Sequence, residues 1–127
     1  MRGMHHVALI SSDYRIAKEF YVDLLGLEQI DENYREERRS WKLDLRMPDG
    51  TQIELFTFPD APVRPSGPEA QGLRHLSFGV ENLDAWVSYL RANRVAVEEV
   101  RIDPYTGKRF TFFKDPDNLP LELYESA

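Results

Sequence analysis

Hydrophobic and polar positions along the chain follow two periods, and they do so twice in the same order. Two segments have apolar residues at the i, i+3, i+4, i+7 spacing of one helix face, within residues 11–26 and 81–93. Shorter stretches with strand-like alternation surround them, at residues 5–10, 27–34, 40–47, 51–58, 74–79, 96–102, 108–113 and 119–124. Each half is therefore predicted to run strand, helix, strand, strand, strand.

The two halves also repeat in their letters. "RMPDGTQIELF", from Arg46, aligns without gaps with "KDPDNLPLELY", from Lys114, and a one-residue slip places His6 opposite His75. We expect one domain over residues 1–127, with module 1 at about 4–58, a Pro- and Gly-rich connector at about 59–72 and module 2 at about 73–127. The predicted fold is α+β: two tandem βαβββ modules that form a cupped, barrel-like mixed sheet with the helices outside.

Strand parity assigns four polar side chains to the face opposite the helices. Because the larger apolar residues of each strand must meet a helix, His6, Glu54, His75 and Glu122 are predicted to point into the cup. Buried carboxylates are costly unless they are protonated, paired with a cation or bound to a metal ion. Their matched occurrence in both halves favours one divalent ion, with Zn, Ni, Co, Fe or Mn all compatible with imidazole and carboxylate ligands.

Other interpretations of these residues stay open. A single histidine or glutamate in a strand is more often structural, and a duplicated module can be a tandem with a filled core. A register shift of one residue would replace His6 by His5, which otherwise has the opposite parity and would pack beside the ligand.

Composition and charge exclude several classes. The 127 residues are 42% hydrophobic and 30% charged, which is a globular balance, and the net charge of -6 leaves no basic face for nucleic acid. Without cysteine the chain has no disulfide and no thiolate ligand. The absence of a long apolar stretch or leader-like start leads us to expect a cytoplasmic protein with no membrane partner.

With these residues in place, the chain resembles the vicinal oxygen chelate superfamily over essentially its whole length. "HHVAL", "IELF", "RHLSF" and "LELYE" occupy the four ligand strands, and the order His6, Glu54, His75, Glu122 is similar to the His-Glu-His-Glu set of glyoxalase I. The resemblance is strongest to small stand-alone glyoxalase I-like proteins, which implies a metal-dependent lyase or isomerase. It also implies a small-molecule substrate and a homodimer, in which each site lies within one chain or is shared between two.

The implied chemistry is proton transfer at an α-oxygenated carbonyl compound. A metal ion can stabilise the enediolate that forms when the adjacent C–H proton leaves. By resemblance, Glu122 is the mobile base and Glu54 its partner, so both are catalytic candidates as well as ligands. Bacterial glyoxalase I usually has an arginine where this chain has Ile10, which argues against glutathione dependence.

Five further residues are candidates for substrate binding. Charge or aromatic character near the ligand strands selects Lys42, Asp44, Phe56, Arg109 and Tyr124. The same charges are equally consistent with edge-strand surface residues, and the aromatic rings with core residues. Two alternative functions remain: a non-haem iron extradiol-type dioxygenase that uses His6, His75 and Glu122, and a metal-free small-molecule binding or resistance protein.

Overall fold

The computed structural model describes residues 1–126, and the chain divides into two compact units, Met1–Val63 and a second that starts at Arg64. The division falls inside the expected connector at 59–72. The expected last residue of module 2, Ala127, lies outside the described residues. Each unit contains its own sheet and helical cover.

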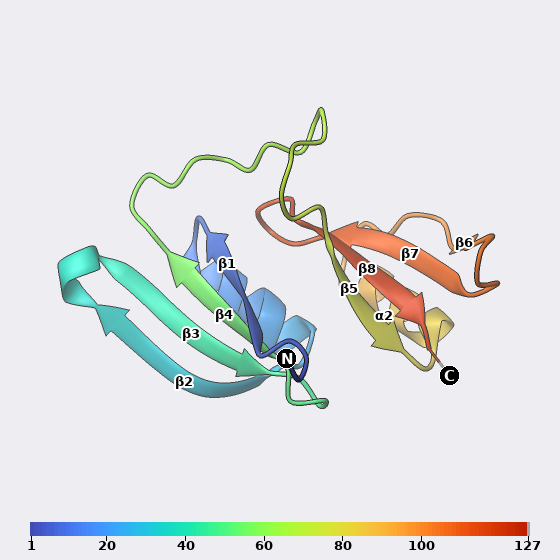
Figure 1. The fold of residues 1–127 in the computed structure, drawn as a ribbon, viewed down its shortest axis with the longest axis horizontal. Helices are drawn as coiled ribbons and strands as arrows, with labels where there is room; N and C mark the ends of the chain where they lie inside the picture. The colour runs from blue at the N-terminus through green and yellow to red at the C-terminus, as the bar shows by residue number, and fades with distance from the viewer. Residues whose placement is uncertain (127) are drawn as a thin grey trace. The chain divides into compact units, whose positions relative to one another are not determined.

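The first unit is built around a four-stranded sheet with the order β1-β4-β3-β2 (Figure 1). Its elements are β1 (His6–Ser11), α1 (Tyr14–Lys18), η1 (Glu19–Leu24), β2 (Glu28–Arg35), η2 (Glu36–Arg38), β3 (Ser40–Arg46) and β4 (Gln52–Thr57). Strand β1 is parallel to β4, whereas β4, β3 and β2 are successively antiparallel.

The second unit repeats this arrangement with the order β5-β8-β7-β6. Its elements are β5 (Leu76–Val80), α2 (Leu83–Ala92), β6 (Arg101–Ile102), β7 (Arg109–Lys114) and β8 (Pro120–Glu125). Again the first strand is parallel to the last, and the other pairs are antiparallel. The predicted α+β class and the repeated βαβββ order are confirmed.

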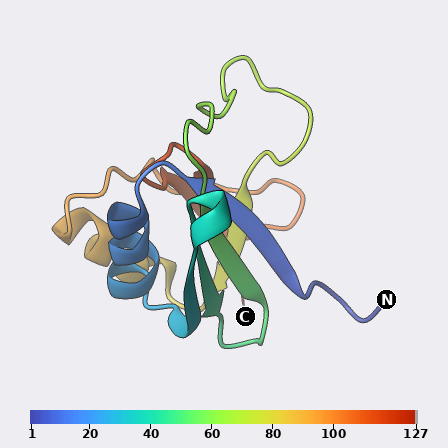
Figure 2. The same cartoon turned by 90° about the vertical axis from the view of Figure 1, so that its left-hand side faces the viewer.

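The helices cover one face of each sheet, because the apolar side chains of the strands lie there. Figure 2 shows α1 and η1 against one face of the first sheet. The buried core beneath the helices contains Leu43, Leu45, Ile53 and Leu55 in the first unit and Leu83, Leu90, Leu121 and Leu123 in the second. The opposite face of each sheet carries the polar side chains of the strands together with aromatic rings such as Phe56, Phe110 and Phe112.

Both helices begin at a side-chain cap. The Asp13 carboxylate accepts a hydrogen bond from the backbone N–H of Ile16, and the Asn82 side chain accepts one from Ala85 N–H. The first helix differs from prediction in its second half, since residues 19–24 form a π-helix in which Leu25 N–H donates to Phe20 C=O. Among residues 1–126, no helix is long and apolar enough to cross a bilayer.

The strand predicted at 96–102 is wrong for most of its length, because only Arg101–Ile102 pair as a strand. Upstream, Glu98 N–H still donates to Phe112 C=O, but Glu98 C=O accepts from the Thr111 hydroxyl instead of a backbone N–H. A side chain therefore takes the place of a ladder hydrogen bond, and regular pairing starts only three residues later.

Candidate metal site

The first predicted pair of ligands comes together on the open face of the first sheet. His6 begins β1, and Glu54 lies on the parallel neighbour β4 between the buried Ile53 and Leu55. Because its neighbours face the helices, the Glu54 carboxylate points the other way, and its Oε1 lies 3.6 Å from His6 Nε2. The Glu54 side chain is 17% exposed and the His6 side chain is 41% exposed.

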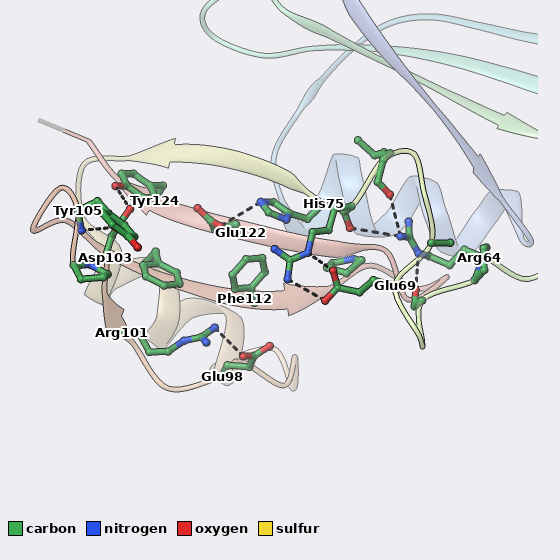
Figure 3. Close-up of a pocket in the computed structure, with 18 residues that line it drawn as sticks. Arg64, Glu69, His75, Glu98, Arg101, Asp103, Tyr105, Phe112, Glu122 and Tyr124 are labelled. Atoms are coloured by element: carbon green, nitrogen blue, oxygen red, sulfur yellow. Dashed lines mark hydrogen bonds and ion pairs between the residues drawn. The ribbon is translucent and has the colours of Figure 1, made fainter.

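The second pair repeats this geometry in the second unit. Glu122 lies on β8 between Leu121 and Leu123, both of which are buried on the helix side. Its Oε2 lies 3.4 Å from Nε2 of His75, the residue immediately before β5 (Figure 3). The Ser77 hydroxyl, directly across from Glu122 on β5, donates to the other carboxylate oxygen at 3.0 Å.

These pairs have the spacing of two ligands on one ion. With metal–ligand bonds of about 2.0 to 2.2 Å, two ligand atoms at the tetrahedral angle stand about 3.4 Å apart. The observed imidazole-to-carboxylate separations of 3.6 and 3.4 Å lie close to that value and beyond a normal hydrogen bond. Each pair therefore has the donor set and spacing of two ligands on one divalent ion, whereas no cluster of three or more His, Cys, Asp or Glu side chains that could hold a metal ion occurs within residues 1–126.

The orientation of both imidazoles is compatible with ligation through Nε2. The Nδ1 atoms of His5 and His6 lie 2.9 Å apart with the two rings edge to face, so His6 Nε2 is the atom turned toward Glu54. In the second unit, the buried Nδ1 of His75 has no hydrogen-bond partner among the described residues. The polar contact of the His75 ring is thus made by Nε2 with Glu122.

Three of the predicted substrate-binding residues share the face of His6 and Glu54. The Lys42 ammonium donates to both oxygens of Asp44, at 2.7 and 2.8 Å, and lies 3.9 Å from Glu54 Oε2. It also lies 5.9 Å from the centre of the Phe56 ring. Lys42, Asp44 and Phe56 therefore surround the first carboxylate with a fixed cation, a second carboxylate and an apolar surface.

A cavity of about 610 Å³ opens beside the second pair, within the second unit (Figure 3). His75, Glu122, Phe110, Phe112 and Tyr124 line it from the sheet. Its volume is typical of pockets for small molecules. The cavity thus places one predicted ligand pair in contact with space large enough for a substrate.

A turn at residues 103–106 lines the cavity beside Tyr124. The Tyr124 hydroxyl donates to the Asp103 carboxylate at 3.0 Å. Hydrogen bonds from the backbone N–H of Tyr105 and from the Tyr124 hydroxyl lower the pKa of Asp103 below its ordinary value. Tyr124, the fourth predicted substrate-binding residue, is therefore in the cavity, with its hydroxyl engaged by the turn.

Arg109, the remaining predicted substrate-binding residue, lies on the helix-covered face of the second sheet. Its guanidinium donates to Asp84 of α2 at 3.2 Å and to Glu125 of β8 at 2.9 Å. These two carboxylates raise the pKa of Arg109, and the guanidinium lowers the pKa of Glu125. Arg109 therefore joins the helix to the sheet and does not face the cavity.

Two residues of the site were not selected from the sequence. Ser77 shares the parity of His75, which was the available signal for its place beside Glu122. Arg101 lines the cavity from β6, with its guanidinium carbon 5.1 Å from the centre of the Phe110 ring. It was hidden because the strand that carries it is so short.

Comparison with known proteins agrees with the predicted fold and family. The model of the Glyoxalase/Bleomycin resistance protein/Dioxygenase superfamily matches residues 3–123. The chain belongs to this superfamily. Members include enzymes such as lyases and epimerases, and divalent metal ions are common in them.

Similar proteins cover nearly the whole chain. The chain is 56% identical to YwkD of Bacillus subtilis, over 98% of both chains, and 55% identical to YaeR of Escherichia coli, over 98% of this chain and 97% of the relative; both bear the description "uncharacterized". The crystal structure of a glyoxalase family protein from Enterococcus faecalis superposes with a TM-score of 0.91 at 46% identity, over 98% of both chains. A 2-epi-5-epi-valiolone epimerase from Actinomyces sp. is 30% identical, over 95% of this chain and 78% of the relative.

Proposed function

We propose that the protein is a divalent-metal-dependent lyase or isomerase of the glyoxalase I type that acts on a small α-oxygenated carbonyl compound. The proposed ligands are His6, Glu54, His75 and Glu122. The observation that carries the proposal is the repeated pair geometry, with imidazole-to-carboxylate distances of 3.6 and 3.4 Å at equivalent positions of the two units. Within each pair, this separation suits two ligands of one ion better than it suits a hydrogen bond.

When bound, the metal ion supplies a positive charge that polarises the substrate carbonyl and lowers the cost of removing the adjacent proton. Glu122 accepts that proton and returns it to a carbon of the substrate. The assignment of Glu122 as base follows from its position in the wall of the cavity, with Oε2 toward His75 and Oε1 held by Ser77. Glu54, next to Lys42 in the first unit, is assigned as ligand and proton-transfer partner.

The cavity wall next to Glu122 is aromatic. Phe112 stands directly across from Glu122 in the β7–β8 pair, and its ring meets that of His75 edge to face, with 5.1 Å between the ring centres. The Phe112 ring therefore lies beside the Glu122 carboxylate in the cavity wall. The similarity to an epimerase supports this type of chemistry, since epimerisation changes the configuration at a carbon atom.

The proposal is tested by metal analysis combined with proton exchange. Purified protein is stripped of metal, reloaded with one ion at a time (Zn, Ni, Co, Fe or Mn), and incubated in D₂O with hemithioacetals and α-hydroxy ketones. Exchange at the carbon next to the carbonyl is followed by NMR. We expect one ion per chain, whether each site lies within one chain or is shared in a homodimer, and exchange that depends on that ion.

Glu122→Gln should abolish exchange, and Glu54→Gln should reduce metal affinity. The controls are Glu99→Gln and Glu37→Gln, which neutralise exposed carboxylates of the second and first unit. Exchange that persists in Glu122→Gln would remove the base assignment. Consumption of O₂ by the iron form would favour the dioxygenase alternative, and tight ligand binding without any metal would favour the binding protein.

A further inference from the structure

The cavity contains a cation whose position fits one part of a substrate. Arg101 lies across from Phe110 in the β6–β7 pair, and its guanidinium carbon stands 5.1 Å from the Phe110 ring centre and 5.7 Å from that of Phe112. Phe112 in turn neighbours Glu122 and His75. Along this face, one aromatic ring therefore separates the Arg101 guanidinium from the proposed reacting groups (Figure 3).

Most hydrogen-bonding capacity of this guanidinium is left for a ligand. Among the described residues, its hydrogen bond runs from Nη2 to Glu98 Oε1 at 3.1 Å, between side chains that are 52% and 58% exposed. A guanidinium has five N–H donors in one plane. Contact with the faces of two phenyl rings orients that plane and leaves its edges available.

The two other arginines of the cavity wall are occupied by the segment before β5. Arg64 donates to the Ser66 hydroxyl at 2.6 Å and to the Leu73 carbonyl at 3.2 Å. Arg74 pairs with Glu69 at 2.8 Å. Both therefore hold the connector in place, and Arg101 is the cation with donors to spare.

We propose that Arg101 binds a carboxylate group of the substrate, so that the substrate is an α-hydroxy carbonyl compound that also bears a carboxylate. This inference rests on the proposed function for the reacting part of the molecule. A carboxylate matches the planar fork of one guanidinium and can accept two of the N–H groups that Glu98 does not engage. A phosphate dianion is disfavoured because the cavity wall also carries Glu69, Glu98, Asp103 and Glu122.

The test compares two forms of one probe. The probes are 5-hydroxy-4-oxopentanoate and its methyl ester, which differ in the carboxylate charge, with dihydroxyacetone phosphate as the phosphate counterpart. Exchange of the hydroxymethylene hydrogens in D₂O is measured with metal-loaded wild-type protein, Arg101→Gln, Arg101→Lys and the control Arg38→Gln, which removes an exposed arginine of the first unit.

We expect the acid to exceed the ester in kcat/KM by about tenfold or more, mainly through KM, as for a charged hydrogen bond at a half-exposed site. Arg101→Gln should remove this preference, Arg101→Lys should keep part of it, and Arg38→Gln should leave it unchanged. An unchanged preference in Arg101→Gln would overturn the inference, as would an Arg101-dependent preference for dihydroxyacetone phosphate.

A binding measurement separates this inference from the proposed function. Calorimetric titration of the acid and the ester into wild-type and Arg101→Gln protein needs no turnover. If no probe exchanges but wild-type protein binds the acid at least tenfold more tightly than the ester, and Arg101→Gln does not, the carboxylate site stands while the proposed chemistry fails. Equal affinity of wild-type protein for acid and ester would refute the carboxylate site.

Discussion

Removal of the Ser77 hydroxyl provides a sharp test of how the second ligand pair is held. In the structure this hydroxyl donates to Glu122 Oε1 at 3.0 Å, and the carboxylate that it contacts has a side chain only 12% exposed. Ser77→Ala leaves a methyl group in place of the donor. Since so little of the Glu122 side chain is exposed, water replaces the lost hydrogen bond poorly.

The expected magnitude follows from that contact. A hydrogen bond to a charged group contributes about 1.5 to 3 kcal/mol, and about 1.4 kcal/mol corresponds to a tenfold change in an equilibrium constant. If Glu122 is a ligand, Ser77→Ala should weaken metal affinity by about 10- to 100-fold, which is the usual range for partners that orient a ligand.

The assay is competition for Zn²⁺ between metal-free protein and a fluorescent chelator at neutral pH. Ser88→Ala is the matched control, because it also removes one serine hydroxyl, but from an exposed position on α2. Urea unfolding of both variants in the metal-free state checks that the fold is intact. If the Zn²⁺ affinities of Ser77→Ala and Ser88→Ala agree within twofold, Glu122 is not a ligand oriented by Ser77.

Three further predictions concern stability, each measured by urea unfolding of metal-free protein. Leu121 is fully buried, so Leu121→Ala should lower the free energy of unfolding by about 2 to 5 kcal/mol; a loss below 1 kcal/mol would contradict the burial. Asn82→Ala removes the cap on Ala85 N–H and should cost about 1 kcal/mol, whereas Asn82→Asp should restore most of it. The hydrogen bond from Lys18 lowers the pKa of Glu32 below its ordinary value of 4.5, so the stabilisation by Glu32 is present above pH 4.5 and is lost as the pH falls through the folded-state pKa. The difference in free energy of unfolding between wild type and Glu32→Gln should therefore disappear in acid. A constant difference from pH 7 to pH 3 would refute this prediction.

Sequence periodicity was enough to predict the fold, because each strand had to bury one face. Ile53 and Leu55 on β4, and Leu121 and Leu123 on β8, are 2% exposed or less, as their alternation with Glu54 and Glu122 requires. The same parity predicted that both glutamates and both histidines lie opposite the helices, and the structure places each glutamate beside the histidine of its own unit. The alternation along a strand predicts the direction of a side chain, and the internal repeat predicts equivalent side chains in the other unit.

Features that depend on contacts between distant segments could not be predicted. The charge of Arg109 suggested that it binds an anion, but the carboxylates of Asp84 and Glu125 accept its hydrogen bonds on the helix side of the sheet. The Thr111 hydroxyl bonds to the Glu98 carbonyl, three residues before β6, in place of a backbone N–H. Nothing in the local sequence of residues 96–102 indicates that hydrogen bond. The π-helical turn at 19–24 likewise shares its apolar spacing with an α-helix.

The two units have similar histidine–glutamate pairs but different residues around them, and that difference bears on the proposed function. Glu54 lies 3.9 Å from an ammonium group that Asp44 also holds, whereas Glu122 accepts from a neutral hydroxyl and faces the cavity. Two carboxylates with identical surroundings would compete for the same role, but a proton acceptor and a fixed ligand need different neighbours. Under the proposed function, the difference between Lys42 beside Glu54 and Ser77 beside Glu122 is the reason to propose Glu54 as the fixed ligand and Glu122 as the group that also transfers the proton.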